Sequence, residues 1–205
     1  SEKKIILIFD ECTSGFRQSL GGLHKFYKIN PDMAVFGKAL GNGYAITALI
    51  GKKDIMREAQ KTFISSTFWT ERIGPAAALA TLEEMERVKS WKIINNNGLK
   101  IMELWNKLSK THNIKIRISG LPALSSFSFE SKNSQKYKTL ITQEMLKSNI
   151  LASNSIYLSI AHTEKMFQFY YKKLDNIFKI IKKCEEGYDI NKLLEFKIAN
   201  NSFGR

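Results

Sequence analysis

Cysteine is scarce in this sequence, and its scarcity argues against two ways of stabilising a fold. Among the 205 residues only Cys12 and Cys184 are cysteines. They lie far apart, and neither belongs to a Cys-x-x-Cys or Cys/His cluster, so neither a disulfide framework nor a structural zinc site is expected. Two unclustered thiols fit a reducing setting, and we expect a cytoplasmic location.

Long apolar runs are also lacking. No stretch approaches the roughly 18 apolar residues that a membrane-spanning helix needs, so we expect no membrane association. The first residues, Ser1–Lys4, show no signal-peptide pattern, and the chain enters an apolar run at Ile5. A fold that opens on a buried strand without a lead-in indicates that an upstream portion of a longer protein is missing.

Positive charge is abundant, but the motifs of nucleic-acid recognition are not. Lys and Arg total 32 against 19 Asp and Glu, which gives a net charge of +13. The lysines are scattered in short groups, with no arginine-rich arm, helix-turn-helix signature or RNP-like strand, and charge alone supports only non-specific affinity. We therefore expect no specific nucleic-acid partner. A hydrophobic fraction of 43% is typical of a globular chain of one large or two small domains.

The first part of the chain has the pattern of an α/β domain. Ile5–Phe9 is a continuous apolar run, which predicts a strand covered on both faces and ending at Asp10. Met33–Phe36 predicts a second strand, which Gly37 and Lys38 follow. A third strand (Ala45–Ile50), a short helix (Asp54–Ala59) and a helix from about Glu71 to Arg87 come next.

Beyond Ser90 the pattern changes to that of a smaller α+β unit. An amphipathic helix covers Ser90–Lys110, although Asn95–Gly98 weakens its middle. The later strands are predicted at Ile114–Ile118, Leu124–Phe129 and Ser155–Ile160, and the later helices at Gln135–Lys147 and Glu164–Lys183. We predict a large domain over residues 1–89, a small domain over 90–187 and a tail over 188–205.

Two residues could carry chemistry, an acid and an amine. Asp10 ends one buried strand and Lys38 follows the next, so both would emerge at the carboxyl edge of a sheet, where ligands of α/β proteins bind. A lysine between Gly37 and Ala39 lacks flanking charges, so its amine could act as a nucleophile toward carbonyls. An aspartate facing it could hold the ring-nitrogen proton of a pyridine cofactor. The alternative is that Asp10 caps a turn and Lys38 is simply exposed.

Two segments resemble the signatures of the class III aminotransferases. Leu7–Arg17 (LIFDECTSGFR) is similar to their Asp-Glu-Val-x-x-Gly-Phe-Arg segment, and Pro31–Tyr44 (PDMAVFGKALGNGY) resembles their cofactor-lysine signature. Within that class the chain most resembles the glutamate-1-semialdehyde 2,1-aminomutases, which Gly21-Gly22, Gly51–Met56 and Ile160–Glu164 support. The resemblance runs from about residue 5 to about residue 183, and its motifs are specific only jointly.

The resemblance implies a fold-type-I, aspartate aminotransferase-like enzyme that depends on pyridoxal 5'-phosphate. The chain would hold part of its large domain followed by a small α+β domain. By position, Lys38 would form the Schiff base and move the substrate's Cα proton, and Asp10 would pair with the pyridinium nitrogen. Cys12 stands where the family usually has a valine that packs on the cofactor ring. Thr67 corresponds to the threonine that binds the phosphate of the partner subunit in a homodimer, with Thr70 as the alternative.

Other residues of the matched segments are assigned structural duties. Arg17 is read as structural first, and His162 as part of a His-Thr pair in which Thr163 is the N-cap of the next helix. The tryptophans at 69, 91 and 105 are expected to be packing residues. The family's usual Gly-Asn-Pro is replaced by Thr70-Glu71-Arg72, which bears on substrate contacts.

The activity that the resemblance implies is amino-group transfer or an intramolecular amino shift on a small molecule. The family's upstream half, with its phosphate cup, has no counterpart in this sequence, so we expect the chain alone to bind the cofactor weakly and to be inactive. One alternative is an aminotransferase for a sugar or amine in surface-polysaccharide synthesis. Another is a non-catalytic remnant that serves as a dimerisation module.

Overall fold

The computed structural model describes residues 5–65, 67 and 70–199. Contacts within the chain divide it into two compact units, Ser1–Ile93 and Ile94–Arg205, which we call unit 1 and unit 2. The predicted division into residues 1–89, 90–187 and 188–205 stays a prediction. Within the described ranges, no helix is long and apolar enough to span a membrane.

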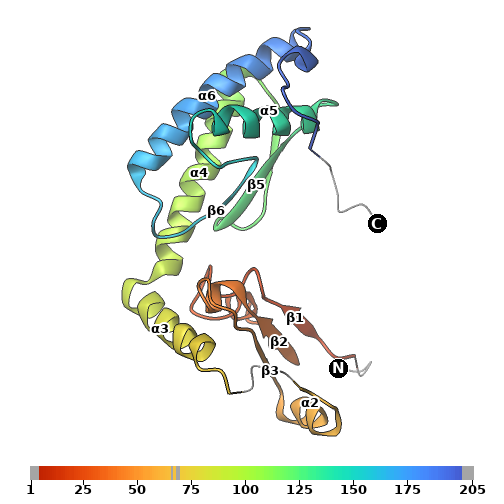
Figure 1. Ribbon diagram of the computed structural model, residues 1–205, viewed down its shortest axis with the longest axis vertical. Helices are drawn as coiled ribbons and strands as arrows, with labels where there is room; N and C mark the ends of the chain where they lie inside the picture. Colours follow the sequence, from red (N-terminus) through yellow and green to blue (C-terminus); the bar gives the residue numbers. More distant parts are fainter. Residues whose placement is uncertain (1–4, 66, 68–69, 200–205) are drawn as a thin grey trace. The chain divides into compact units, whose positions relative to one another are not determined.

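Unit 1 is built on a three-stranded mixed sheet with the order β1-β2-β3 (Figure 1). Strand β1 (Ile8–Asp10) runs parallel to β2 (Met33–Phe36), and β3 (Ala48–Gly51) runs antiparallel to β2. The helical elements of unit 1 are α1 (Leu23–Phe26), the 3-10 turn η1 (Lys38–Leu40), α2 (Lys53–Met56), the 3-10 turn η2 (Arg57–Lys61) and α3 (Ile73–Val88).

The core of unit 1 is small. Side chains of β2 alternate between the two faces, so that Ala34 and Phe36 pack with Leu40 and Ala78. The predicted burial of β1 on both faces was wrong. The strand is only three residues long, and the four apolar side chains from Ile5 to Ile8 are between 44% and 68% exposed. In the described chain only β2 pairs with β1, and only Phe9 of the run packs against the core.

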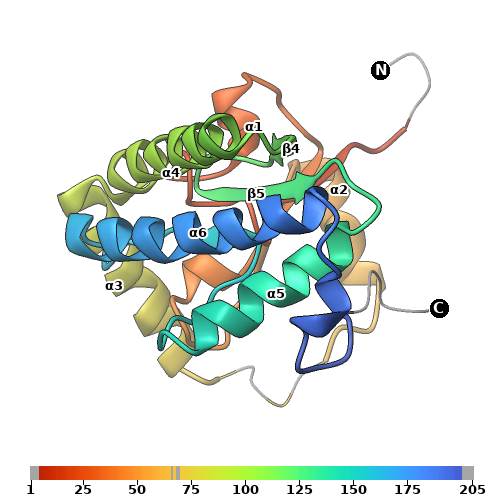
Figure 2. The same cartoon turned by 90° about the horizontal axis from the view of Figure 1, so that it is seen from above.

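Unit 2 contains an antiparallel sheet with the order β4-β5-β6. Its helices cover this sheet, and α5 lies beside α6 (Figure 2). The strands are β4 (Ile116–Ser119), β5 (Leu124–Phe129) and β6 (Ser155–Tyr157). The helices are α4 (Ser90–His112), which begins in unit 1, then α5 (Ser134–Leu146), α6 (Glu164–Glu185) and the 3-10 turn η3 (Ile190–Lys192).

A large apolar core holds unit 2 together. Trp105 of α4 is fully buried and donates from its indole N–H to the Tyr170 hydroxyl of α6 at 3.0 Å.

Helix α4 is continuous through Asn95–Gly98, so the predicted weakness in its middle was wrong. A Cβ on Gly98 would lie 2.0 Å from the carbonyl oxygen of Pro122, so this glycine permits close packing that offsets its low helix propensity.

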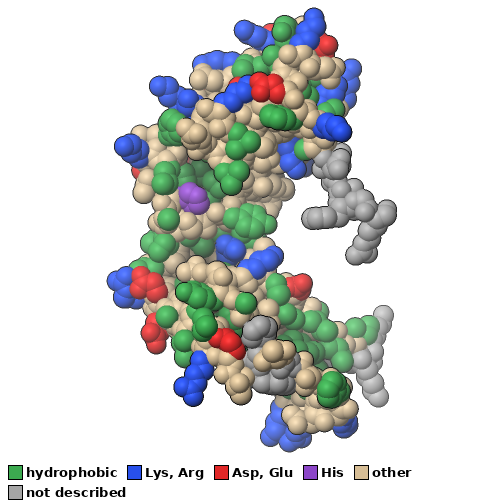
Figure 3. All heavy atoms as spheres, in the orientation of Figure 1, with side chains coloured by type: hydrophobic (Ala, Val, Ile, Leu, Met, Phe, Trp, Pro, Cys, Tyr) green, Lys and Arg blue, Asp and Glu red, His purple; other side chains and the backbone are tan. Residues whose placement is uncertain are grey.

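The surface carries its positive charge in separate places. On the face that Figure 3 shows, Lys and Arg side chains lie in small groups interspersed with Asp and Glu. Several are paired, for example Arg87 with Glu84 at 2.6 Å and Lys147 with Glu195 at 2.5 Å. This distribution is typical of a solvated surface with mixed charge.

Candidate active site at the carboxyl ends of β1 and β2

Parallel pairing of β1 and β2 brings Asp10 and Lys38 to the same edge of the sheet. Asp10 ends β1 opposite Val35 of β2, and Lys38 follows β2 after Gly37. Both residues therefore emerge where the two strands present their carboxyl ends, as the sequence predicts.

The backbone at Lys38 adopts a left-handed conformation, with φ of +43°. For a residue other than glycine this conformation costs about 1–3 kcal/mol and is often found at functional sites. It opens the 3-10 turn η1, which the sequence did not reveal, and in that turn Gly41 N donates to the Lys38 carbonyl at 3.2 Å. The turn sets the direction in which the Lys38 side chain leaves the sheet.

The Lys38 amine has a hydrogen-bond partner that the sequence reasoning missed. Its Nζ atom donates to the hydroxyl of Thr13, which lies in the loop that follows β1. The one feature of the sequence that pointed to Thr13 is its position three residues after Asp10, within the matched motif. Lys38 itself is exposed, so its amine can be reached from solvent.

Asp10 is held in its charged form by its surroundings. Its Oδ1 atom accepts from the backbone N–H of Cys12 at 3.0 Å. This bond, the Cys12 side chain and the charge of Lys38 keep the pKa of Asp10 below its ordinary value of 3.8, against a smaller desolvation effect. The carboxylate is therefore available to a cationic partner at neutral pH.

Cys12 lies close to both Asp10 and Gly37, the residue that precedes the 3-10 turn η1. Its sulfur is 3.6 Å from the position that a Cβ on Gly37 would occupy. Burial, followed by the hydrogen bond and charge of Asp10, raises the pKa of the Cys12 thiol above its ordinary value of 9.0. At neutral pH the thiol is protonated, which suits a packing role better than a reactive one.

Glu11 anchors the loop that carries Cys12 and Thr13, and the sequence reasoning gave it no role. Its side chain is 2% exposed, and its oxygens accept from Ser14 Oγ, Leu23 N and His24 N, each at 2.8 Å. The His24 ring nitrogen Nδ1 lies 3.0 Å from the same carboxylate. Burial raises the pKa of Glu11, but these hydrogen bonds outweigh it and lower the pKa below 4.5.

Arg17 makes a hydrogen bond within the same loop. Its Nε atom donates to the Thr13 carbonyl at 2.8 Å, which fits the structural duty predicted for it. With Glu11 bound to α1 and Arg17 bound to Thr13, the loop after β1 has a defined backbone. We call residues 11–17 the motif loop.

Thr67 lies in the segment between η2 and α3, and it is exposed. Of the hydrogen bonds among described residues, none joins Thr67 or Thr70 to Asp10 or Lys38. Trp69, which belongs to the same segment of the sequence, lies outside the described residues. The phosphate role of Thr67 therefore stays a prediction.

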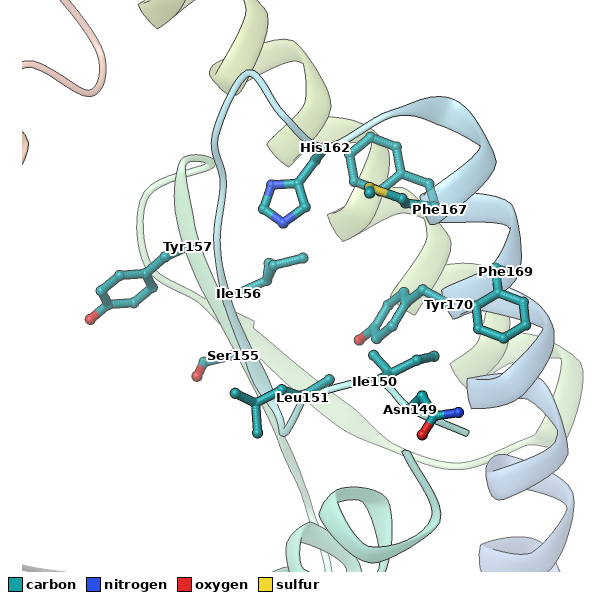
Figure 4. Close-up of a pocket in the computed structure, with 12 residues that line it drawn as sticks. Asn149, Ile150, Leu151, Ser155, Ile156, Tyr157, His162, Phe167, Phe169 and Tyr170 are labelled. Atoms are coloured by element: carbon teal, nitrogen blue, oxygen red, sulfur yellow. The ribbon is translucent and has the colours of Figure 1, made fainter. Parts of the chain in front are cut away.

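His162 lies in unit 2 and lines an apolar pocket of about 450 Å³ (Figure 4). Its Nδ1 atom accepts from Ser159 N at 3.0 Å, and its ring stacks on Phe167 with centroids 6.2 Å apart. Thr163 is the N-cap of α6, as predicted, and its hydroxyl accepts from Met166 N. These contacts fit a structural histidine.

The sequence matches the family model of the class III aminotransferases over residues 1–184. The chain belongs to the class III aminotransferase family. A curated relative, the 3-aminobutyryl-CoA aminotransferase of Cloacimonas acidaminovorans, is 35% identical over 78% of this chain and 40% of its own length. The glutamate-1-semialdehyde 2,1-aminomutase of Saccharolobus islandicus is 28% identical over 86% of this chain and 44% of its own length. The chain thus spans less than half the length of these class III relatives.

Solved structures confirm the predicted fold class. The FumI protein of Sphingopyxis sp. MTA144, solved in its pyridoxal-phosphate internal aldimine form, matches 93% of this class III chain with a TM-score of 0.83 and 21% identity. The ornithine aminotransferase of Plasmodium yoelii matches 87% with a TM-score of 0.74 and 16% identity. The match covers 47% and 50% of those two chains, so this chain has part of the transaminase fold.

Proposed function

We propose that the edge formed by Asp10, the motif loop and Lys38 is the lysine side of a pyridoxal-phosphate site for amino-group transfer or an intramolecular amino shift. The observation that carries the proposal is the presence of an accessible amine and a charged carboxylate at the carboxyl ends of two neighbouring parallel strands. Family membership supports the same assignment.

The residues present fit the ring and the aldehyde of this cofactor. Asp10 is a carboxylate that stays ionised, as the partner of a protonated ring nitrogen must be. Cys12 offers a small neutral side chain beside Gly37 against which a flat ring can pack. For the phosphate, we propose Thr67 as one donor.

When bound, the cofactor supplies an aldehyde and an electron-withdrawing ring. Lys38 would contribute the nucleophilic amine, and once the substrate is bound the same amine would move a proton between the substrate's Cα atom and the cofactor, as general base and then general acid. Asp10 holds the proton on the ring nitrogen, because its negative charge favours the cationic ring.

Covalent trapping tests the proposal directly. Because the chain alone is expected to bind the cofactor weakly, the 205-residue chain is incubated with a large excess of pyridoxal 5'-phosphate. It is then reduced with borohydride and digested, and the label on each lysine is quantified by mass spectrometry. We expect Lys38 to carry more label than exposed lysines such as Lys100. Lys38→Ala should remove that label, and Asp10→Asn should reduce it.

A label spread evenly over the exposed lysines, or concentrated on a different one, would contradict the proposal and favour a non-catalytic module. Free pyridoxal without the phosphate is the matched probe control. Equal labelling by both probes would place the phosphate donors outside this chain while leaving the role of Lys38 intact.

The substrate is proposed to be a small molecule with an amino group. The relatives named above act on a coenzyme A thioester and on a semialdehyde, according to their names. The Thr70-Glu71-Arg72 sequence departs from the family motif, so an aminotransferase that acts on a sugar or amine in surface-polysaccharide synthesis is the second candidate. Measuring pyridoxamine formation with a panel of amino donors would distinguish these substrate classes. Release of product without net conversion of the cofactor would indicate an intramolecular amino shift, as in an aminomutase.

We also propose that the whole protein is a cytoplasmic homodimer. Apolar side chains next to Thr67 support the dimer, since Phe63 is 96% exposed and Ile64 is 58% exposed. The free thiols Cys12 and Cys184 support a reducing compartment. Sedimentation velocity of the chain and of its Phe63→Asp variant tests the dimer, which the variant should weaken.

A further inference from the structure

We propose that Thr13 is a positioning residue that holds the Lys38 amine away from Asp10. Its hydroxyl gives the amine a neutral acceptor, so the carboxylate stays open to a cationic ring nitrogen. The inference deepens the proposed function and rests on it only for the identity of that ring.

The hydroxyl of Thr13 is carried on a loop whose backbone is held in place. The motif loop is held by Glu11, whose carboxylate accepts two backbone N–H groups of α1, and by Arg17, which donates to the Thr13 carbonyl. Thr13 is half-buried, and its branched Cβ restricts rotation about χ1. A hydroxyl on such a loop is a preorganised acceptor.

The Lys38 side chain can rotate about several bonds. It is exposed and has four rotatable bonds, so its amine would otherwise sample many positions. The left-handed backbone of Lys38 sets the direction of the side chain, and the bond to Thr13 Oγ1 fixes its end.

Two cationic groups could bind the Asp10 carboxylate: the Lys38 amine and the ring nitrogen of the proposed cofactor. Lys38 is close enough to Asp10 for its charge to act on the carboxylate, and Asp10 receives hydrogen bonds from Cys12. A free amine at this range would be drawn into a direct ion pair with Asp10. That pair would occupy both groups that the proposed cofactor needs, and a neutral acceptor for the amine avoids it.

The test compares Thr13→Val, which keeps the shape and removes the acceptor, with Thr13→Ser, which keeps the hydroxyl. Thr62→Val is the matched control, since Thr62 Oγ1 donates to the Ala59 carbonyl in η2. The Asp10 carboxyl carbon is followed by NMR across acidic pH in each variant. We expect the pKa of Asp10 to fall further in Thr13→Val, because the amine moves onto it, and to stay unchanged in Thr13→Ser and Thr62→Val.

The trapping experiment supplies a second readout. Thr13→Val should reduce the pyridoxal-phosphate label on Lys38 about fivefold, the scale expected for one lost hydrogen bond. Thr13→Ser should stay close to the original chain. If Thr13→Val does not fold, Thr13→Ala, which also lacks the hydroxyl, replaces it.

An unchanged Asp10 titration in the folded hydroxyl-free variant would overturn the inference, whatever the label shows. If the original chain takes no label on Lys38, the proposed function fails, but the Asp10 titration still decides whether Thr13 separates the two charges. The two failures are therefore distinguishable.

Discussion

Unit 1 and unit 2 differ in the size of their apolar cores and in where the candidate site residues lie. Unit 2 buries a large core that includes Trp105, Phe127 and Leu174, each at most 1% exposed. In unit 1 the described buried core consists of Ala34, Phe36, Leu40 and Ala78, and apolar side chains of β1 remain exposed. Yet all candidate site residues of the sequence analysis lie in unit 1.

The difference teaches that the two units depend on different forces. Apolar burial stabilises unit 2, because each buried side chain contributes about 1.5–3 kcal/mol. The motif loop of unit 1 depends instead on hydrogen bonds to one buried carboxylate, Glu11. Four substitutions test whether the two units are stabilised in these different ways.

The largest expected effect is in the core of unit 2. Leu174→Ala should lower the free energy of unfolding by about 2–5 kcal/mol, because it leaves a cavity at a fully buried position. Urea unfolding followed by circular dichroism measures this. Leu151→Ala is the same change at a side chain that is 92% exposed, and it should stay within about 0.5 kcal/mol. Equal losses in the two variants would contradict the assigned core.

Gly98→Ala should destabilise unit 2 by about 1–3 kcal/mol, although alanine is the better helix former. The added Cβ would lie 2.0 Å from the Pro122 carbonyl oxygen, so α4 or the turn must move. The control, Asn96→Ala, changes an exposed residue of the same helix and should be neutral or slightly stabilising. A higher melting temperature for Gly98→Ala would show that the close contact is absent.

Glu11→Gln should weaken unit 1 by about 1–3 kcal/mol, because an amide cannot accept all the hydrogen bonds that the carboxylate receives. The pKa of Glu11 is below 4.5 in the folded chain, so its contribution is complete above pH 4.5 and is lost as the pH falls through the folded value. Hydrogen exchange of peptides covering residues 7–40 measures both effects.

In the original chain, the protection of residues 7–40 from hydrogen exchange should decrease in acid. This decrease should be absent in Glu11→Gln and present in the control Glu58→Gln, whose side chain is exposed. Peptides of unit 2 should be unaffected in both variants. Faster exchange throughout unit 2 in Glu11→Gln would break the separation between the two units.

The smallest effect is expected for Lys52→Met. Lys52 Nζ lies 2.8 Å from Asp32 Oδ1, but its side chain is 50% exposed, so the pair should contribute less than about 1 kcal/mol and weaken with salt. Asp32 also accepts from Leu7 N, so exchange at this amide is the local readout. If the stability lost in Lys52→Met did not depend on salt concentration, the aliphatic part of the Lys52 side chain would be contributing by packing.

Much of the fold could be predicted because its signals are local. Strand β2 has the bounds that its apolar run predicts, since Pro31 precedes the run and Gly37 follows it. Strand β5 also has its predicted bounds, and it follows the turn at Gly120-Leu121-Pro122. Thr163 was recognisable as an N-cap for the same reason. The predictions that failed concern tertiary contacts: the exposed run from Ile5 to Ile8 lacks a second covering layer in the described chain, and Gly98 meets Pro122.

The candidate site was predictable in part. Asp10 and Lys38 follow apolar strands, and a parallel sheet brings such positions to one edge whatever the side chains around them. The roles of Glu11 and Thr13 were not visible, because their partners lie 12–13 and 25 residues away. Pairing over such separations depends on the path of the loop, which no local pattern encodes.

The amino-acid pattern alone was enough to predict the family, the main strands and helices, the acid that ends β1 and the amine that follows β2. These follow from hydrophobic period and from motifs of neighbouring residues. Only the tertiary structure decided that a buried carboxylate anchors the motif loop and that a threonine hydroxyl takes the Lys38 amine. The reason is that a hydrogen bond needs its two atoms within about 3 Å, and only the folded backbone sets that distance.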